Sequence, residues 1–84
     1  MNVLIIEDDP VIGKAVQKGL SEAGHSCDWI MDGKAGFEAA SSQRHDVIVL
    51  DLLLPGEPGL SLLGRLRRQG ILTPGIVLTA LVQG

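Results

Sequence analysis

The sequence predicts an α/β fold with a doubly wound parallel sheet, and three observations support this class. Short apolar runs of strand length alternate along the 84 residues with longer segments of helical periodicity. Two of the runs, 2–6 and 46–50, are apolar at almost every position, as in strands buried on both faces. Glycine, proline and aspartate punctuate the boundaries. This alternation predicts right-handed crossovers with helices on both sides of the sheet.

The first strand and the first helix have the clearest signals. Residues 2–6 are a short β-branched run that reads as a buried strand. Asp9 followed by Pro10 is a favourable helix start, because the carboxylate caps the helix and proline suits its first position. Apolar residues then recur with helical period until Gly24, which predicts the end of the helix.

The remaining elements follow in the same alternation. Residues 25–30 form a more polar strand, suited to a sheet edge, and 34–43 form an Ala-rich helix. The third strand, 46–50, closes on an aspartate and leads into a loop rich in proline and glycine. A third helix with leucines at helical spacing runs from residue 60 to near residue 70. Residues 75–79 are the fourth strand, giving four strands and three helices.

Composition excludes several function classes. With 7 Lys and Arg against 10 Asp and Glu, the net charge is −3, which argues against a nucleic-acid-binding surface. The single cysteine, Cys27, rules out an internal disulfide framework and fits a reducing compartment. No apolar run reaches the roughly 18 residues of a membrane span, and no basic segment precedes the first apolar run. We therefore expect a cytoplasmic protein without membrane contact.

Polar residues end three of the four predicted strands. Glu7 and Asp8 follow the first strand, Asp51 follows the third, and Thr79 ends the fourth. Function in such sheets lies beyond the carboxyl ends of the strands, so these side chains are expected to converge if the first and third strands are neighbours. Three close carboxylates repel one another, and a hard divalent cation such as Mg²⁺ offsets that repulsion. A phosphoryl group at Asp51 would complete the cation's shell, with the Thr79 hydroxyl bonding one of its oxygens.

A single acid after a strand is more often a helix cap or a solvated loop residue, as Asp9 is expected to be. The joint placement of acids on two strands and a hydroxyl on a third favours a site. At this point the sequence resembles the receiver domain of bacterial two-component response regulators, in the transcription-factor branch with a winged-helix output domain. Three segments in order carry the resemblance, which covers the whole chain: Ile5-Ile6-Glu7-Asp8-Asp9, Val49-Leu50-Asp51-Leu52-Leu53-Leu54-Pro55-Gly56 and Leu78-Thr79-Ala80.

The resemblance implies a flavodoxin-like sheet with strand order 2-1-3-4, and a role for each matching residue. Asp51 is the expected phosphoacceptor, which takes its phosphoryl group from a sensor histidine kinase. Mg²⁺ is the expected cofactor, held by Asp51 and Asp8 directly, by Glu7 mainly through water, and by the backbone carbonyl of Leu53. Thr79 is the expected switch hydroxyl. The domain is then a phosphoacceptor and not an enzyme in its own right.

The chain also departs from the family pattern. Residues 1–84 match a truncated receiver domain, without the fourth helix, the fifth strand with its lysine and switch aromatic, the fifth helix or an output domain. We expect either a longer natural chain or a truncation, and DNA contact only through the absent output domain. The exposed edge of 75–79 predicts that the 84-residue chain forms homodimers or otherwise self-associates.

The sequence leaves room for other functions besides phosphoacceptance. The main alternative is a receiver-fold interaction or dimerisation module that is not phosphorylated. A haloacid-dehalogenase-like phosphatase would need a second aspartate where Leu53 stands, and a dinucleotide site would need a glycine-rich turn after the first strand. His25 and His45 lack metal-ligand spacing and are expected to be solvated, as is the arginine cluster at 65–68. Trp29 is interpreted as strand packing.

Overall fold

The structure, a computed structural model, describes residues 1–78. Four parallel strands form one sheet in the order β2-β1-β3-β6, and a two-stranded hairpin, β4-β5, lies beside it. The fourth strand predicted from the sequence is β6 in the structure. The observed order therefore confirms the predicted flavodoxin-like sheet with strand order 2-1-3-4, and three helices accompany it as predicted. The elements in chain order are β1 (Asn2–Ile6), α1 (Pro10–Glu22), β2 (Ser26–Ile30), α2 (Gly33–Ser41), β3 (Val47–Asp51), β4 (Leu53–Leu54), β5 (Glu57–Pro58), α3 (Gly59–Arg68) and β6 (Gly75–Leu78).

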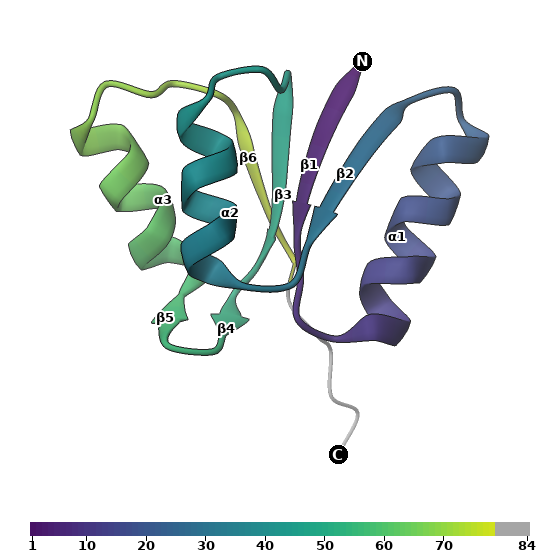
Figure 1. Ribbon diagram of the computed structural model, residues 1–84, viewed down its shortest axis with the longest axis horizontal. Coiled ribbons are helices and arrows are strands. Elements are labelled where there is room, and N and C mark those ends of the chain that lie inside the picture. The colour runs from purple at the N-terminus through teal and green to yellow at the C-terminus, as the bar shows by residue number, and fades with distance from the viewer. Residues whose placement is uncertain (79–84) are drawn as a thin grey trace.

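Helices cover both faces of the sheet, with α1 on one side and α2 and α3 on the other (Figure 1). Successive side chains of a strand point to opposite faces, so β1 contributes to two cores. Val3 and Ile5 pack on the α1 side, and Leu4 and Ile6 pack on the side of α2 and α3. All four are almost fully buried. Burial on both faces explains why β1 and β3 are apolar at nearly every position.

Two helices begin at an aspartate cap, one of them as predicted. The Asp9 carboxylate accepts hydrogen bonds from the backbone N–H groups of Val11 and Ile12, at 2.8 and 3.3 Å, and a proline follows at the first position of α1. Asp32 caps α2 by accepting from the N–H of Ala35 at 2.9 Å. Each cap satisfies backbone donors that the first helical turn leaves free. None of the helices within residues 1–78 is long and apolar enough to cross a membrane.

The hairpin is a feature that the sequence did not predict. Leu53 pairs with Pro58, and Leu54 pairs with Glu57, inside the segment predicted as a loop. Gly56 lies at the turn with a φ of 81°, a conformation that favours glycine. Strands of two residues are too short to show any periodicity, which explains why sequence patterns do not reveal them.

The expectation of a solvated side chain was wrong for His45, whereas Arg65 keeps a partly exposed side chain that also has partners. His45 is 9% exposed, and its Nε2 lies 2.8 Å from Asp28 Oδ2. Arg65 donates two hydrogen bonds to the Glu57 carboxylate, at 2.9 and 2.6 Å, and its guanidinium lies 4.1 Å from the centre of the Phe37 ring. Asp28 and Phe37 are distant in the sequence from His45 and Arg65, so local pattern carries no information about these two contacts.

Candidate functional site

Three carboxylates meet at the carboxyl edge of the sheet. β1 and β3 are parallel neighbours, with Ile6 beside Leu50, so the residues that follow Ile6 lie next to Asp51 at the end of β3. One carboxylate oxygen from each of Glu7, Asp8 and Asp51 lies within 4.8 Å of the others. We call these three residues the acidic cluster. The structure therefore brings together the three acids that the strand pattern predicted to converge.

Glu7 is the buried member of the acidic cluster, with 1% of its surface exposed. Its pKa is raised from the ordinary value of 4.5 to about 7. Burial is the largest cause, followed by hydrogen bonding to the Asp51 carboxyl group and the negative charges of Asp51 and Asp8. The N–H of Asp9, which donates to Glu7 Oε1 at 3.2 Å, acts in the opposite direction. Near neutral pH, Glu7 is thus poised between its protonated and ionised forms.

Backbone contacts position Asp51 from two sides. The N–H of Leu53 donates to Asp51 Oδ1 at 3.1 Å, which fixes the carboxylate relative to β4. The N–H of Gly59 donates to Leu52 at 2.8 Å, and a Cβ at Gly59 would collide with the carbonyl oxygen of Asp51. The first turn of α3 can therefore lie against the end of β3 because residue 59 has no side chain.

The donor set of the acidic cluster fits a hard divalent cation. Carboxylate oxygens are the ligands that Mg²⁺ prefers, at about 2.1 Å, so that opposite ligands of an octahedral shell are about 4.2 Å apart. The spread of 4.8 Å within the cluster is slightly larger. A small contraction, or a water between one carboxylate and the ion, accommodates that difference. A cation here would also offset the repulsion among the carboxylates, which adds to the effect of burial on the pKa of Glu7.

Comparison with known proteins identifies the family. Residues 3–83 match the family model described as the response regulator receiver domain. This chain is a member of that family. It is 46% identical over 80 residues to the transcriptional activator protein IrlR of Burkholderia pseudomallei, covering 95% of this chain and 34% of that protein. The chain thus spans about a third of the length of that relative.

Solved structures of receiver domains agree with the fold. The receiver domain of the Francisella response regulator 1452 superimposes with a TM-score of 0.89 and 38% identity, covering 95% of this chain and 66% of that one. The BeF3-activated N-terminal receiver domain of RstA from Klebsiella pneumoniae superimposes with a TM-score of 0.88 and 28% identity, covering 99% and 70%. The described sheet and helices therefore form part of a receiver domain.

The structure describes one of the two further residues predicted for the receiver site, Leu53, and does not describe the other, Thr79. Leu53 follows the acidic cluster on β4, with its backbone beside Asp51 and its side chain 75% exposed. An apolar side chain is tolerated there because it points to solvent while the backbone makes the contact. Thr79, the predicted switch hydroxyl, lies outside the described residues, so its role stays a prediction.

Sequence reasoning missed a contact between Trp29 and the receiver site. The indole N–H of Trp29 donates to the backbone carbonyl of Glu7 at 2.9 Å. The parallel register pairs Trp29 with Ile5, two residues before Glu7. That register, combined with the length of an indole ring, is the signal that could have placed Trp29 beside residues 7–9 between β1 and α1, which we call the acidic loop.

A hollow of about 300 Å³ lies at the opposite, amino edge of the receiver sheet. Its lining residues come from the neighbouring strands β1 and β2 and from the loop before β3: Asn2, Ser26, Cys27, Asp28, Arg44 and His45. Within residues 1–78, no group of three possible metal ligands gathers there. The amino edge has a hollow without a set of three metal ligands, whereas the acidic cluster has such a set. The acidic cluster is therefore the candidate functional site.

Proposed function

We propose that this receiver domain accepts a phosphoryl group on Asp51 from a sensor histidine kinase in a Mg²⁺-dependent transfer. The observation that supports it is the acidic cluster itself. Three carboxylates lie within 4.8 Å of one another, and within residues 1–78 no lysine, arginine or histidine forms an ion pair with any of them. Uncompensated negative charge at the end of a parallel sheet is a site prepared for a cation and a phosphoryl group.

Asp51 acts as the nucleophile in this proposal. The N–H of Leu53 holds Oδ1, which leaves Oδ2 to attack phosphorus in line with the leaving group. The new O–P bond forms as the P–N bond of phosphohistidine breaks. The departing imidazole keeps the electron pair and gains a proton, and the product is an aspartyl phosphate.

The other residues of the site would bind the cation and orient the phosphoryl group. Asp8 would bind Mg²⁺ directly, Glu7 mainly through water, and the carbonyl of Leu53 would add a further ligand. The bound ion supplies positive charge that offsets the repulsion between the carboxylates and the incoming phosphoryl oxygens. The Thr79 hydroxyl would bond one phosphoryl oxygen and so act as the switch.

The signal would be read by another domain or protein. The relative IrlR is a transcriptional activator, which supports a winged-helix, DNA-binding output beyond the receiver portion matched here. In this view, residues 1–84 form a receiver segment whose fourth helix, fifth strand, fifth helix and output domain lie in further chain. The domain would work in the cytoplasm, where histidine kinases present their phosphohistidine, and as an acceptor rather than a stand-alone enzyme.

Intact mass after incubation with acetyl phosphate, with and without Mg²⁺, tests the proposal. We expect a Mg²⁺-dependent gain of one phosphoryl group that Asp51→Asn abolishes. Asp46→Asn is the matched control, because Asp46 precedes the same strand at its other end and lies outside the acidic cluster. It should keep the gain. A folded wild-type chain that gains no phosphoryl group would contradict the proposal.

That negative result would favour the second candidate, a non-phosphorylated interaction or dimerisation module. One observation supports self-association: Ile76 on β6 is 55% exposed, and within residues 1–78 β6 pairs with β3 alone. An open strand edge with an apolar side chain is a template for pairing with a second copy. Light scattering on the 84-residue chain should show a dimer or larger species, unaffected by Asp51→Asn, whereas a monomeric mass would refute it.

A further inference from the structure

We infer that Trp29 is a positioning residue, whose indole N–H fixes the acidic loop in the geometry that binds the divalent cation. The inference rests on the proposed function, because it concerns the same site. It assigns to an aromatic side chain of β2 a role in a site built from β1 and β3.

Both backbone groups of Glu7 are bonded to the end of β2. Its N–H donates to the carbonyl of Ile30 at 3.0 Å, which extends the parallel ladder by one residue. Its carbonyl accepts from Trp29 Nε1 at 2.9 Å. The indole therefore takes the place that a backbone donor would occupy if the ladder continued.

The bond to Trp29 also determines where Asp8 lies. The peptide unit is planar, so fixing the Glu7 carbonyl fixes the plane that carries the N and Cα atoms of Asp8. Asp8 is the expected direct ligand of the cation, and Glu7 the expected ligand through water. One hydrogen bond thus constrains two members of the acidic cluster, in the way that outer partners orient the ligands of other metal sites.

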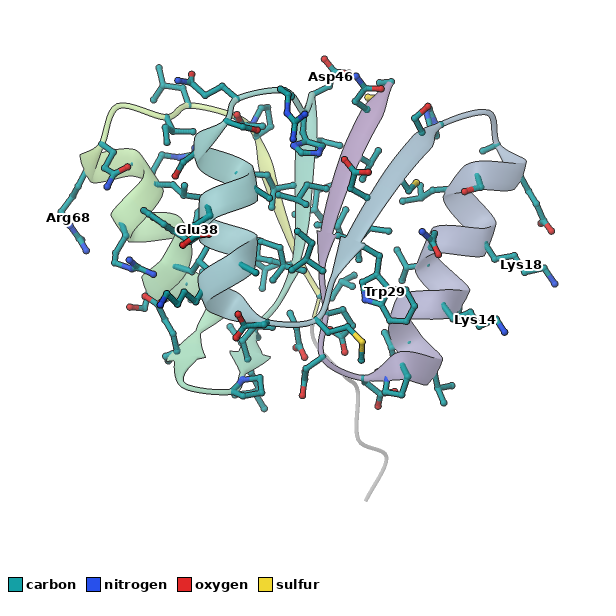
Figure 2. The ribbon with its side chains drawn as sticks, in the orientation of Figure 1. Lys14, Lys18, Trp29, Glu38, Asp46 and Arg68 are labelled. Atoms are coloured by element: carbon teal, nitrogen blue, oxygen red, sulfur yellow. The ribbon has the colours of Figure 1, made fainter. Side chains whose placement is uncertain are left out.

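The ring of Trp29 is held in place by close packing against α1. Figure 2 shows Trp29 between the strands and α1. A Cβ at Gly13 would collide with ring atoms Cε2 and Cζ2, so the indole occupies the space that a side chain on α1 would fill. Gly13 is buried, and Trp29 packs in the same core as Val16 and Leu20 of α1. The donor atom therefore has little freedom to leave the Glu7 carbonyl.

A packing role alone is the competing explanation. Val16, Leu20 and Cys27 pack against the same core without any hydrogen bond to the acidic loop among the described contacts. Trp29 differs from them by one bond, to Glu7. The test must therefore remove the N–H while leaving the packing, and compare the result with a pure packing loss.

Calorimetric titration with MgCl₂ separates these explanations. We expect Trp29→Phe to weaken Mg²⁺ binding about tenfold, as loss of an outer partner typically does. Leu20→Ala is the matched control, since it removes packing from the same core and keeps the bond to Glu7. A second variant carries benzothiophene in place of indole at position 29, which keeps the ring shape and replaces the N–H by sulfur. It should reproduce the loss of affinity even if Trp29→Phe does not fold.

The outcomes distinguish this inference from the proposed function. If the wild-type chain binds Mg²⁺ and the benzothiophene variant binds it equally well, the positioning role is wrong and the phosphoacceptor proposal stands. If Leu20→Ala loses as much affinity as Trp29→Phe, general destabilisation explains the effect and the inference again fails. If the folded wild-type chain binds no Mg²⁺, the proposed function fails, and the inference that rests on it fails too.

Discussion

The two edges of the sheet treat their acidic residues in opposite ways. At the amino edge Asp28 lies 2.8 Å from His45 Nε2, Asp46 accepts from the N–H of Asn2 at 2.7 Å, and within residues 1–78 neither belongs to a cluster of carboxylates. At the carboxyl edge the acidic cluster places three carboxylates within 4.8 Å of one another, and its buried member has a pKa raised to about 7. Within residues 1–78, Asp28 and Asp46 are thus kept apart from other acids at one end of the sheet, and three acids are crowded together at the other.

The difference gives the two edges different expected responses to mutation. A paired acid lowers the free energy of the folded chain, or leaves it unchanged, whereas a crowded acid raises it. An unfavourable electrostatic energy of this kind is tolerated where a bound ligand offsets it, as at many functional sites. The comparison predicts that changes at the two edges affect stability with opposite signs.

The largest expected effect is that of Glu7→Gln. Removing one charge from the acidic cluster should raise the free energy of unfolding by about 3 kcal/mol near pH 8 without divalent cations, because the pKa of Glu7 moves from 4.5 to about 7 on folding. Urea denaturation measures the change. Affinity for Mg²⁺ should fall at the same time. A variant no more stable than wild type would show that ionised Glu7 does not destabilise the folded chain.

The next effect is the pH dependence of the cation-free chain. Glu7 ionises near 4.5 when unfolded and near 7 when folded, so the unfolded chain releases this proton first as the pH rises. Stability should therefore fall by about 2 kcal/mol between about pH 5.5 and pH 8 from this group, and level off above pH 7. Denaturation at several pH values measures it.

Glu7→Gln is the control for that profile and should flatten it. Saturating MgCl₂ should do the same, since a bound cation favours the ionised carboxylate. An equally steep profile in Glu7→Gln would assign the pH dependence to other groups.

The smallest effect lies at the amino edge. His45→Ala should lower the free energy of unfolding by about 1 to 2 kcal/mol, because it removes a buried ring and its bond to Asp28. Thermal denaturation measures the loss, and Mg²⁺ affinity should stay within about twofold of wild type. A large change in Mg²⁺ affinity would show that the amino edge influences the acidic cluster, contrary to this prediction.

Sequence patterns predicted much of this molecule for identifiable reasons. Strands buried on both faces leave continuous apolar runs, and an aspartate before a proline marks a helix start, so β1, β3 and α1 were visible in the sequence. The acidic cluster was predictable because the carboxyl ends of parallel strands share one edge, once the order of the strands was inferred.

The features that were missed depend on contacts between distant segments. His45 is buried by the fold around β3 and meets Asp28 of β2, which lies 17 residues away in the sequence. Arg65 finds Phe37 and Glu57 only when α3 packs beside α2 and the hairpin. Periodicity describes which face of an element is apolar, but not which polar side chains it will meet.

The indole beside Gly13 has one more consequence, for spectroscopy. The chain contains one tryptophan and no tyrosine, so a single residue accounts for its near-ultraviolet emission. That fluorophore is bonded through its ring nitrogen to the carbonyl of Glu7. The wavelength and intensity of its light therefore report directly on the loop that carries the acids, and the protein can be observed without a label.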